Sequence, residues 1–278
     1  MRLALAAALG GVLLLALPLP AGLGIPLRGA WVVLLAGILV WQLLKPFFIQ
    51  RHLIAAWLHL PSRRAPVRYV RALFDEYADR YDRHLLYDLR YAAPNLVRTI
   101  VGDRLDGRPD AVVADLGCGT GLCGPLFRRV AGRLIGVDLS PRMLREAGRR
   151  EVYDELLEAD LVAFLDGRRD AFDLLIAADV LVYLGDLEPL LRAAALALQP
   201  AGLMALTLEE GSGDGFVLRA SGRFAHGERY LERVVGQCGL QLLAVRRAPI
   251  RHEAGEPVAG IVALVARSPV IGCVQSSR

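Results

Sequence analysis

The chain has 278 residues and a mean hydropathy of +0.39, and 54% of its residues are hydrophobic. This length accommodates one α/β domain of ordinary size together with an additional segment. The net charge is +4, but the eight basic residues that precede Asp75, the first acidic residue, carry +8, so the chain from Asp75 onward carries −4. Because nucleic-acid-binding domains carry a basic patch on the folded domain, this distribution argues against a nucleic-acid partner.

The first fifty residues, Met1–Gln50, contain three charged residues and no acidic residue. Leu3–Leu27 and Gly29–Leu44 are two apolar runs, each close to the ~20 residues that a helix needs to span a bilayer. Trp31 and Trp41 lie in the second run, as expected of an interfacial tryptophan belt. We therefore predict two transmembrane helices that form a hairpin with both ends in the cytoplasm.

Two other interpretations of this segment stay open. Arg2, the leucine-rich stretch and Pro18–Gly22 loosely match the three regions of a cleaved signal peptide, which would leave a single anchor. The two runs could also be helices buried in a soluble domain. The hairpin is favoured because the charged residues that follow it, up to Arg71, are all basic and would hold that side in the cytoplasm.

Residues 51–74 form a predicted amphipathic connecting segment, either packed on the domain or lying at a membrane surface. Beyond it, apolar runs of strand length alternate with helical patterns, which is typical of a parallel sheet with helices on both faces. The last two runs, at 239–251 and 257–267, are separated only by the turn His252–Glu256, so one strand is expected to run antiparallel. Residues 268–278 are expected to form a loose tail.

The stretch VVADLGCGTG, at Val112–Gly121, is the most informative part of the chain. Gly119–Gly124 matches GxGxxG, which alone would also suit a dinucleotide and an NAD(P)-dependent oxidoreductase. Asp115 stands just before the glycines, and its carboxylate would repel a pyrophosphate at the helix N-terminus. It would attract a ligand that carries an ammonium and a sulfonium, such as S-adenosylmethionine (SAM). The glycines would let the backbone approach that cofactor closely.

Asp138 ends the apolar run LIGVD, about where a carboxylate meets ribose hydroxyls in nucleotide-binding βαβ units. Its alternative role is a helix N-cap shared with Ser140, directly before Pro141. The preceding glycine loop favours ribose binding.

Taken in order, the motifs DLGCGTG, GVDLS, EAD at Glu158–Asp160, FDLLIAADVLVYL and LQPAGLMAL resemble the class I SAM-dependent methyltransferase superfamily. More narrowly, VRALFDEYADRYDRHL, DVLVYLGDL and GRFAHGERYLE are similar to the type 11/12-like methyltransferase domains that follow TPR repeats in bacterial proteins, although those repeats are absent here. The resemblance covers residues 75–267. It implies a Rossmann-like seven-stranded α/β sheet, mostly parallel, with helices on both faces and an antiparallel last strand.

The resemblance also implies which residues hold the cofactor. The methionine end would be held by Asp115, Gly117, Gly119 and Gly121. The ribose and adenine would be held by Asp138, Leu139, Asp160 and Leu161. The sulfonium and the mouth of the acceptor site would be lined by Ala178 and Asp179. A lid would include Tyr77 and Tyr81, whose helical spacing suits core packing nearly as well.

Methyl transfer from a sulfonium is an in-line displacement, in which positioning of the nucleophile supplies most of the acceleration. A general base is optional, and the candidates are Asp179 and His226, which lies in a polar stretch expected to fold over the site. The membrane segment favours a small-molecule or lipid-like acceptor. The four cysteines form no CxxC pair, so no metal is expected.

The sequence as a whole predicts a membrane-anchored SAM-dependent methyltransferase. Because SAM is made in the cytosol, the catalytic domain is expected on the cytoplasmic side of the inner (cytoplasmic) membrane, which disfavours the signal-peptide alternative. A non-catalytic SAM-binding or scaffold protein, and less favourably an NAD(P)-dependent oxidoreductase, are the alternatives.

Overall fold

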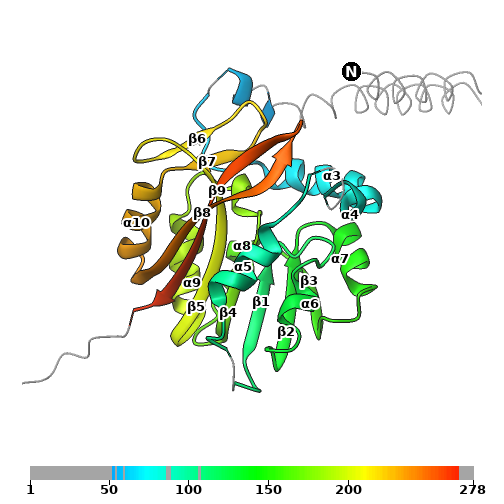
Figure 1. Ribbon diagram of the computed structural model, residues 1–278, viewed down its shortest axis with the longest axis vertical. Coiled ribbons are helices and arrows are strands. Elements are labelled where there is room, and N and C mark those ends of the chain that lie inside the picture. The colour runs from blue at the N-terminus through cyan, green and yellow to red at the C-terminus, as the bar shows by residue number, and fades with distance from the viewer. Residues whose placement is uncertain (1–51, 54, 59, 86–88, 106–107, 269–278) are drawn as a thin grey trace, which may run out of the picture.

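The computed structural model describes residues 52–53, 55–58, 60–85, 89–105 and 108–268 (Figure 1). The two predicted transmembrane helices lie outside these residues, as does the predicted tail apart from Ser268. Within the described part of the chain, no helix is both long enough and apolar enough to cross a membrane.

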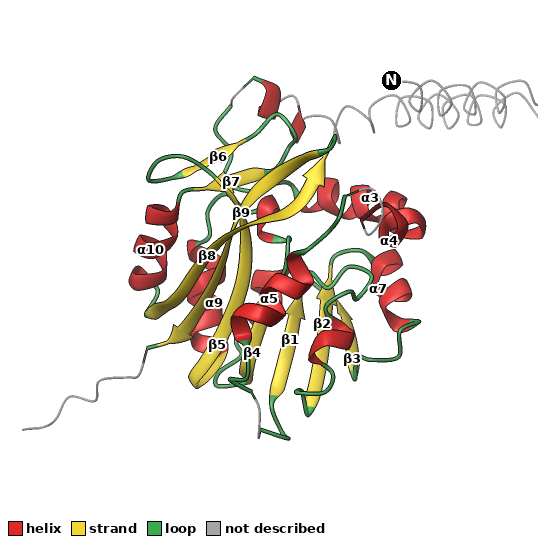
Figure 2. Ribbon diagram, viewed as in Figure 1, coloured by secondary structure: helices red, strands yellow, loops and turns green. Residues whose placement is uncertain are grey.

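The described strands belong to one sheet (Figure 2). They are β1 (Val112–Leu116), β2 (Arg133–Asp138), β3 (Glu155–Glu158), β4 (Phe172–Ala177), β5 (Leu198–Glu210), β6 (Phe216–Leu218), β7 (Phe224–His226), β8 (Leu240–Glu253) and β9 (Glu256–Arg267). The α-helices are α3 (Val67–Tyr77), α4 (Tyr81–Arg83), α5 (Ala93–Val101), α6 (Gly124–Phe127), α7 (Pro141–Gly148), α8 (Leu161–Leu165), α9 (Glu188–Ala197) and α10 (Glu228–Gln237). Two 3₁₀ turns are η1 (Ala78–Arg80) and η3 (Leu181–Tyr183).

Five strands run parallel in the order β3-β2-β1-β4-β5. Beyond them, β9 lies antiparallel between β5 and β8. The tight turn between β8 and β9 places Ala254 and Gly255 at φ values of 50° and 88°, as a two-residue hairpin with the right-handed twist of the strands requires. The predicted parallel sheet with an antiparallel strand near its end is therefore confirmed.

Helices cover both faces of the sheet, and alternate residues of each strand point to opposite layers. In β4, Leu174 and Ile176 pack toward α5 and α6, whereas Leu175 and Ala177 pack toward α8, α9 and α10. Because both faces are buried, the central strands are continuous apolar runs rather than alternating ones.

The structure differs from the expected seven strands by one additional hairpin, β6–β7. Strand β7 pairs in parallel with Glu209 and Glu210 at the end of β5, and β6 pairs antiparallel with β7. Each of these strands has three residues, too few to display an alternating pattern, and the surrounding glycine-rich stretch indicates a loop. The sheet therefore has nine strands.

Candidate active site

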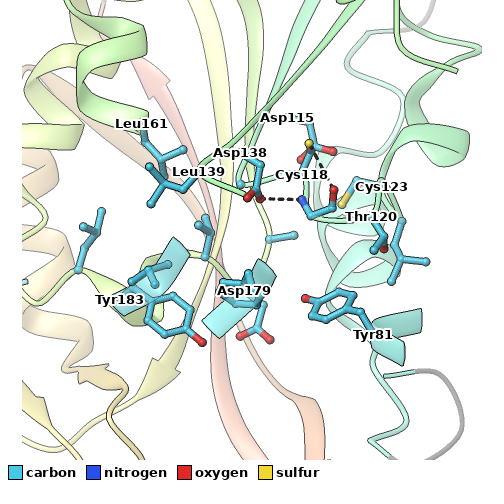
Figure 3. Close-up of a pocket in the computed structure, with 18 of the residues that line it drawn as sticks. Tyr81, Asp115, Cys118, Thr120, Cys123, Asp138, Leu139, Leu161, Asp179 and Tyr183 are labelled. Carbon is cyan, nitrogen blue, oxygen red and sulfur yellow. Dashed lines mark hydrogen bonds between the residues drawn. The ribbon is translucent and has the colours of Figure 1, made fainter. Parts of the chain in front are cut away.

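A pocket of about 870 Å³ opens at the carboxyl ends of β1, β2 and β4 (Figure 3). This is the crevice beside the point where the strand order reverses, between β1 and β4, where open α/β sheets bind their ligands. Ten of the residues predicted from sequence line it: Tyr81, Asp115, Gly117, Gly119, Asp138, Leu139, Asp160, Leu161, Ala178 and Asp179. Gly121, Tyr77 and His226 do not line it.

The glycine loop follows β1 with its glycines at positive φ, 71° at Gly117 and 85° at Gly121. A Cβ added at Gly117 would lie 2.3 Å from a methyl carbon of Val180, and one at Gly121 would lie 2.9 Å from the ring of Tyr153. Glycine is therefore required at both positions for conformation and for space. Gly121 therefore shapes the glycine loop through its close approach to Tyr153 and does not line the pocket.

Asp115 is 2% exposed and ends β1 at the edge of the pocket. The hydroxyl of Tyr153 donates a 2.6 Å hydrogen bond to its Oδ2. Burial raises the pKa of Asp115 to about 7, an effect that the Tyr153 hydrogen bond opposes and the nearby carboxylate of Asp138 reinforces. A buried carboxyl ionises at a cost unless a positive charge lies beside it, so this site is suited to a cationic ligand.

Asp138 faces the pocket from the end of β2. Its Oδ2 accepts a 2.9 Å hydrogen bond from the backbone N–H of Gly119, and its Oδ1 accepts one of 2.8 Å from that of Ser140. The N-cap of α7 is Ser140 alone, whose Oγ accepts from the N–H of Met143 at 3.1 Å. Asp138 is therefore not the cap, and burial raises its pKa against these backbone hydrogen bonds.

Asp160 is already engaged on both carboxylate oxygens. Its Oδ1 caps α8, accepting from the N–H groups of Val162 and Ala163 at 3.1 and 3.3 Å, and its Oδ2 pairs with Arg64. If Asp160 accepts a hydrogen bond from adenine, it does so while its carboxylate also pairs with Arg64. No local pattern in the sequence marks Arg64 as a site residue, because its partner lies 96 residues away.

The chain around Arg64 is tied to the loop that follows β4. The N–H of Ala65 donates to the carbonyl of Tyr183, and the N–H groups of Gly185 and Asp186 donate to the carbonyl of Arg63, all at 2.9 Å. Arg64 and Ala65 both line the pocket. The predicted connecting segment therefore forms one wall of the site.

Asp179 follows β4 with a φ of 54°, in the left-handed region that non-glycine residues rarely adopt. Its N–H donates to the hydroxyl of Thr207 at 2.8 Å, and its Oδ1 accepts from Nη1 of Arg251 at 2.6 Å. Such strain is held in place by surrounding contacts and is characteristic of functional positions. Burial raises the pKa of Asp179, and the Arg251 charge opposes that shift.

Arg251, on β8, is 3% exposed and also pairs with Glu209 and Glu253. Burial alone would favour its neutral form, but the carboxylates of Asp179, Glu209 and Glu253 hold its pKa above the ordinary value. Arg223 pairs with Glu209 and Glu253 as well. Arg219 also pairs with Glu209, at 3.2 Å, so the result is a connected network of three arginines and three carboxylates.

A second cavity of about 950 Å³ adjoins the pocket. The residues common to both are Phe74, Tyr81, Asp179 and Tyr183. Figure 3 shows Tyr183, Asp179 and Tyr81 along one rim, with their oxygens directed to the gap between the tyrosines. Burial raises the pKa of both tyrosine hydroxyls, so they stay neutral. Tyr77 lines only this second cavity.

The structure does not bring His226 to either cavity. It is fully buried in β7, and its Nε2 donates to the carbonyl oxygens of Leu184 and Gly185, at 2.8 and 3.1 Å. Burial lowers its pKa to about 4, against the effect of those hydrogen bonds. The expected loop over the site is instead a strand paired with β5, so the expectation that His226 acts as a base is withdrawn.

Comparison with known proteins agrees with this geometry. The family model described as a methyltransferase domain matches residues 114–206. No curated protein matches the chain.

Within the described residues, no group of three or more His, Cys, Asp or Glu side chains is arranged to hold a metal ion.

Solved structures share the fold. One is the 1,6-didemethyltoxoflavin-N1-methyltransferase of Burkholderia thailandensis, with bound 1,6-didemethyltoxoflavin and S-adenosylhomocysteine: 20% identity, TM-score 0.57, covering 75% of this chain and 92% of that one. Another is the magnesium protoporphyrin IX methyltransferase of Synechocystis PCC 6803 with bound S-adenosylhomocysteine: 18% identity, TM-score 0.58, covering 73% of this chain and 100% of that one.

Proposed function

From the membership of this chain in the class I SAM-dependent methyltransferase superfamily, with SAM as its cofactor, we propose that it is a membrane-anchored enzyme that methylates a small apolar acceptor. The fit of the cofactor rests on two observations. The glycine loop leaves no room for a Cβ at Gly117, and the buried Asp115 needs a positive partner to ionise at neutral pH.

The cofactor supplies an activated methyl group on a sulfonium. Asp115 binds the ammonium of its methionine end, and Tyr153 orients that carboxylate. Asp138, which accepts from the N–H groups of Gly119 and Ser140, would hold the ribose hydroxyls. Leu139 and Leu161 would pack on the adenine, and Ala178 would line the site of the sulfonium.

The acceptor occupies the second cavity. One wall carries Leu73, Tyr77 and Leu85, and the cavity reaches the cofactor pocket through the gap between Tyr81 and Tyr183. These side chains suit an apolar or aromatic part of the acceptor, whereas Arg223, Arg251 and Glu253, which also line the cavity, suit polar groups on it. The two neighbours named above act on ring systems of this general kind, as their names state.

Asp179 stands at the junction of the two cavities and orients the acceptor. An acceptor O–H or N–H would donate to its carboxylate, which would take up the proton that the acceptor loses, while the cofactor would supply the methyl group. The pKa of Asp179 is raised by burial, so the carboxylate accepts this proton more readily than an exposed one would. The proposed function rests above all on one observation: Asp179 lines both cavities.

The anchor is proposed from sequence: the nearly uncharged first fifty residues and the basic residues after them suit a membrane hairpin with a cytoplasmic catalytic domain.

Labelled SAM tests catalysis. Full-length protein in lipid nanodiscs, given methyl-labelled SAM and an organic-solvent extract of its cells, is expected to yield a labelled organic-soluble product with equimolar S-adenosylhomocysteine. Asp179→Asn should keep SAM affinity, measured by calorimetry, and lose most of the turnover. Label that enters only water-soluble products contradicts an apolar acceptor. SAM binding without any product would favour the non-catalytic alternative.

A further inference from the structure

Exposed apolar side chains gather where the described chain begins. Trp57 is 72% exposed, Leu58 51%, Leu60 50%, and Val217, on the neighbouring strand β6, 46%. Leu60 and Val217 line one shallow groove together with Pro61 and Phe216. We call Trp57, Leu58, Leu60 and Val217 the Trp57 surface. A contiguous apolar patch on a protein surface marks an interaction site more often than scattered single residues do.

The orientation of this surface is set by buried contacts behind it. His52 is 3% exposed, and its Nε2 lies 2.8 Å from the carbonyl oxygen of Gly222, to which it donates. Ala56 is fully buried against Leu218 and Phe224. Residues 52–53 and 55–57 are helical, so docking through His52 and Ala56 holds Trp57 on the opposite, outer side.

The Trp57 surface lies at the same end of the sheet as the active site. Strand β7 pairs with Glu209 and Glu210 at the carboxyl end of β5, and the cofactor pocket opens at the carboxyl ends of β1, β2 and β4. Figure 1 shows β6, β7 and the blue segment together at that end of the molecule. Leu243 is also exposed, at 43%, but it lies near the amino end of β8, which runs in the same direction as β5 because both are antiparallel to β9.

We propose that the Trp57 surface rests on an anionic lipid bilayer and thereby turns the active-site end of the catalytic domain toward the membrane; this inference rests on the proposed membrane anchor. Three observations select lipid as the occupant. The apolar Met1–Gln50 ends immediately before this surface. Tryptophan is the side chain that bilayer interfaces favour most. Arg63 lines the same groove as Leu60 and Val217, and its side chain is 84% exposed although it lies 3.4 Å from Asp186, so it can meet lipid phosphates.

Trp57 itself is the reporter for this contact. The chain has three tryptophans, so Trp31→Phe with Trp41→Phe leaves Trp57 as the only one in the full-length protein. This variant is reconstituted into vesicles of phosphatidylcholine and phosphatidylglycerol, with and without brominated phosphatidylcholine, which quenches tryptophan only on contact. Trp57 is expected to lose most of its fluorescence in the brominated vesicles.

A matched control moves the tryptophan to the other end of the molecule. Trp57→Phe and Leu243→Trp, added to the same background, should give a protein whose fluorescence is unaffected by bromine. Sedimentation of the vesicles separates the two proposals. Protein that stays in the supernatant contradicts the anchor and this inference together. Protein that sediments while Trp57 stays unquenched overturns the inference alone, and a blue-shifted unquenched emission assigns the surface to a protein occupant instead.

Discussion

Asp115 and Tyr153 together account for how a buried acid can serve a cationic cofactor. Asp115 is brought to the pocket by the strand end that precedes the glycine loop, and Tyr153 reaches it from 38 residues further along the chain. The hydroxyl favours the ionised carboxyl, whereas burial and Asp138 disfavour it, so the pKa stands at about 7. In the proposed site, ionisation of Asp115 would therefore be coupled to cofactor binding.

SAM affinity should consequently rise with pH in the neutral range. Below its raised pKa Asp115 holds a proton, which the ammonium must displace, so the affinity should fall by up to about tenfold per pH unit below pH ~7. Calorimetric titrations between about pH 6 and pH 7.5, where the α-amino group of SAM remains charged, measure this. Asp115→Asn should bind SAM weakly at every pH in that range; a variant with the wild-type slope would contradict the assignment.

The raised pKa of Asp115 also means that its ionisation lowers the stability of the SAM-free protein. Its folded pKa, about 7, lies above the ordinary aspartate value, so the folded state holds its proton more tightly than the unfolded state does. The stability that protonated Asp115 contributes is fully present below about pH 4 and is lost as the pH rises through about 7. Asp115→Asn should therefore raise the Tm of the SAM-free protein at pH 8 relative to wild type, although it weakens SAM binding. A lower Tm would show that ionised Asp115 stabilises the empty site.

Tyr153→Phe tests the partner of Asp115 while keeping the ring that packs against Gly121. Because the hydroxyl lowers the pKa of Asp115, its removal should move the rise in SAM affinity to higher pH. It should also weaken binding at pH 7 by about tenfold. A uniform loss of affinity with an unchanged pH profile would indicate a packing role only.

At the scale of elements, the terminal hairpin β8–β9 does more than complete the sheet. Its antiparallel pairing carries Arg251 beneath the end of β4, 72 residues after Asp179. The arginine is 3% exposed and faces carboxylates of Asp179, Glu209 and Glu253. A buried charge of this kind holds the strained turn at Asp179 in place, so the hairpin shapes the active site.

Removal of this charge should be costly. Arg251→Met leaves Asp179 buried without its counter-charge, while Glu209 keeps Arg223 and Arg219. It should lower the free energy of unfolding by about 3–5 kcal/mol, measured by urea denaturation. Arg247→Met, on the same strand, removes an arginine that is 62% exposed and pairs with Glu210 and Glu228. It should leave the free energy of unfolding nearly unchanged. Equal effects of the two substitutions would contradict a structural role for the network.

Over the whole molecule, the segment from His52 to Val70 links the predicted membrane region to the catalytic site. It docks on the β6–β7 hairpin through His52, joins the loop after β4 through Arg63 and Ala65, and then enters α3. Arg64, Ala65, Val67 and Val70 line the cofactor pocket. In the proposed function, cofactor binding would therefore be linked to the attachment of this segment.

SAM should protect this segment from proteolysis. Cleavage needs local opening, and a ligand that contacts the closed segment makes opening rarer. Limited trypsin digestion followed by mass spectrometry should show slower cleavage after Arg64 and Arg68 when SAM is present. Cleavage after Arg229, which is 83% exposed and distant from the pocket, serves as the control. Equal slowing at all three sites would reflect global stabilisation rather than the proposed link.

Sequence alone predicted the parts of this protein that depend on local steric and chemical requirements. The glycine loop after β1, the acids at the ends of β1 and β2, and the terminal hairpin each leave a signature within a few neighbouring residues. A backbone that must adopt positive φ demands glycine, and a strand buried on both faces demands a continuous apolar run. The first fifty residues likewise predict a membrane segment, which stays a prediction.

The tertiary structure decided what depends on pairing between distant parts of the chain. The partners of Asp115, Asp160 and Asp179 lie 38, 96 and 72 residues away, and a single tyrosine or arginine carries no mark of the acid that it will meet. His226 shows the converse. Its polar neighbours suggested a loop over the site, but pairing of β7 with the end of β5 turned the ring into the interior. Long-range packing leaves no local pattern, because it is specified jointly by all the elements that meet.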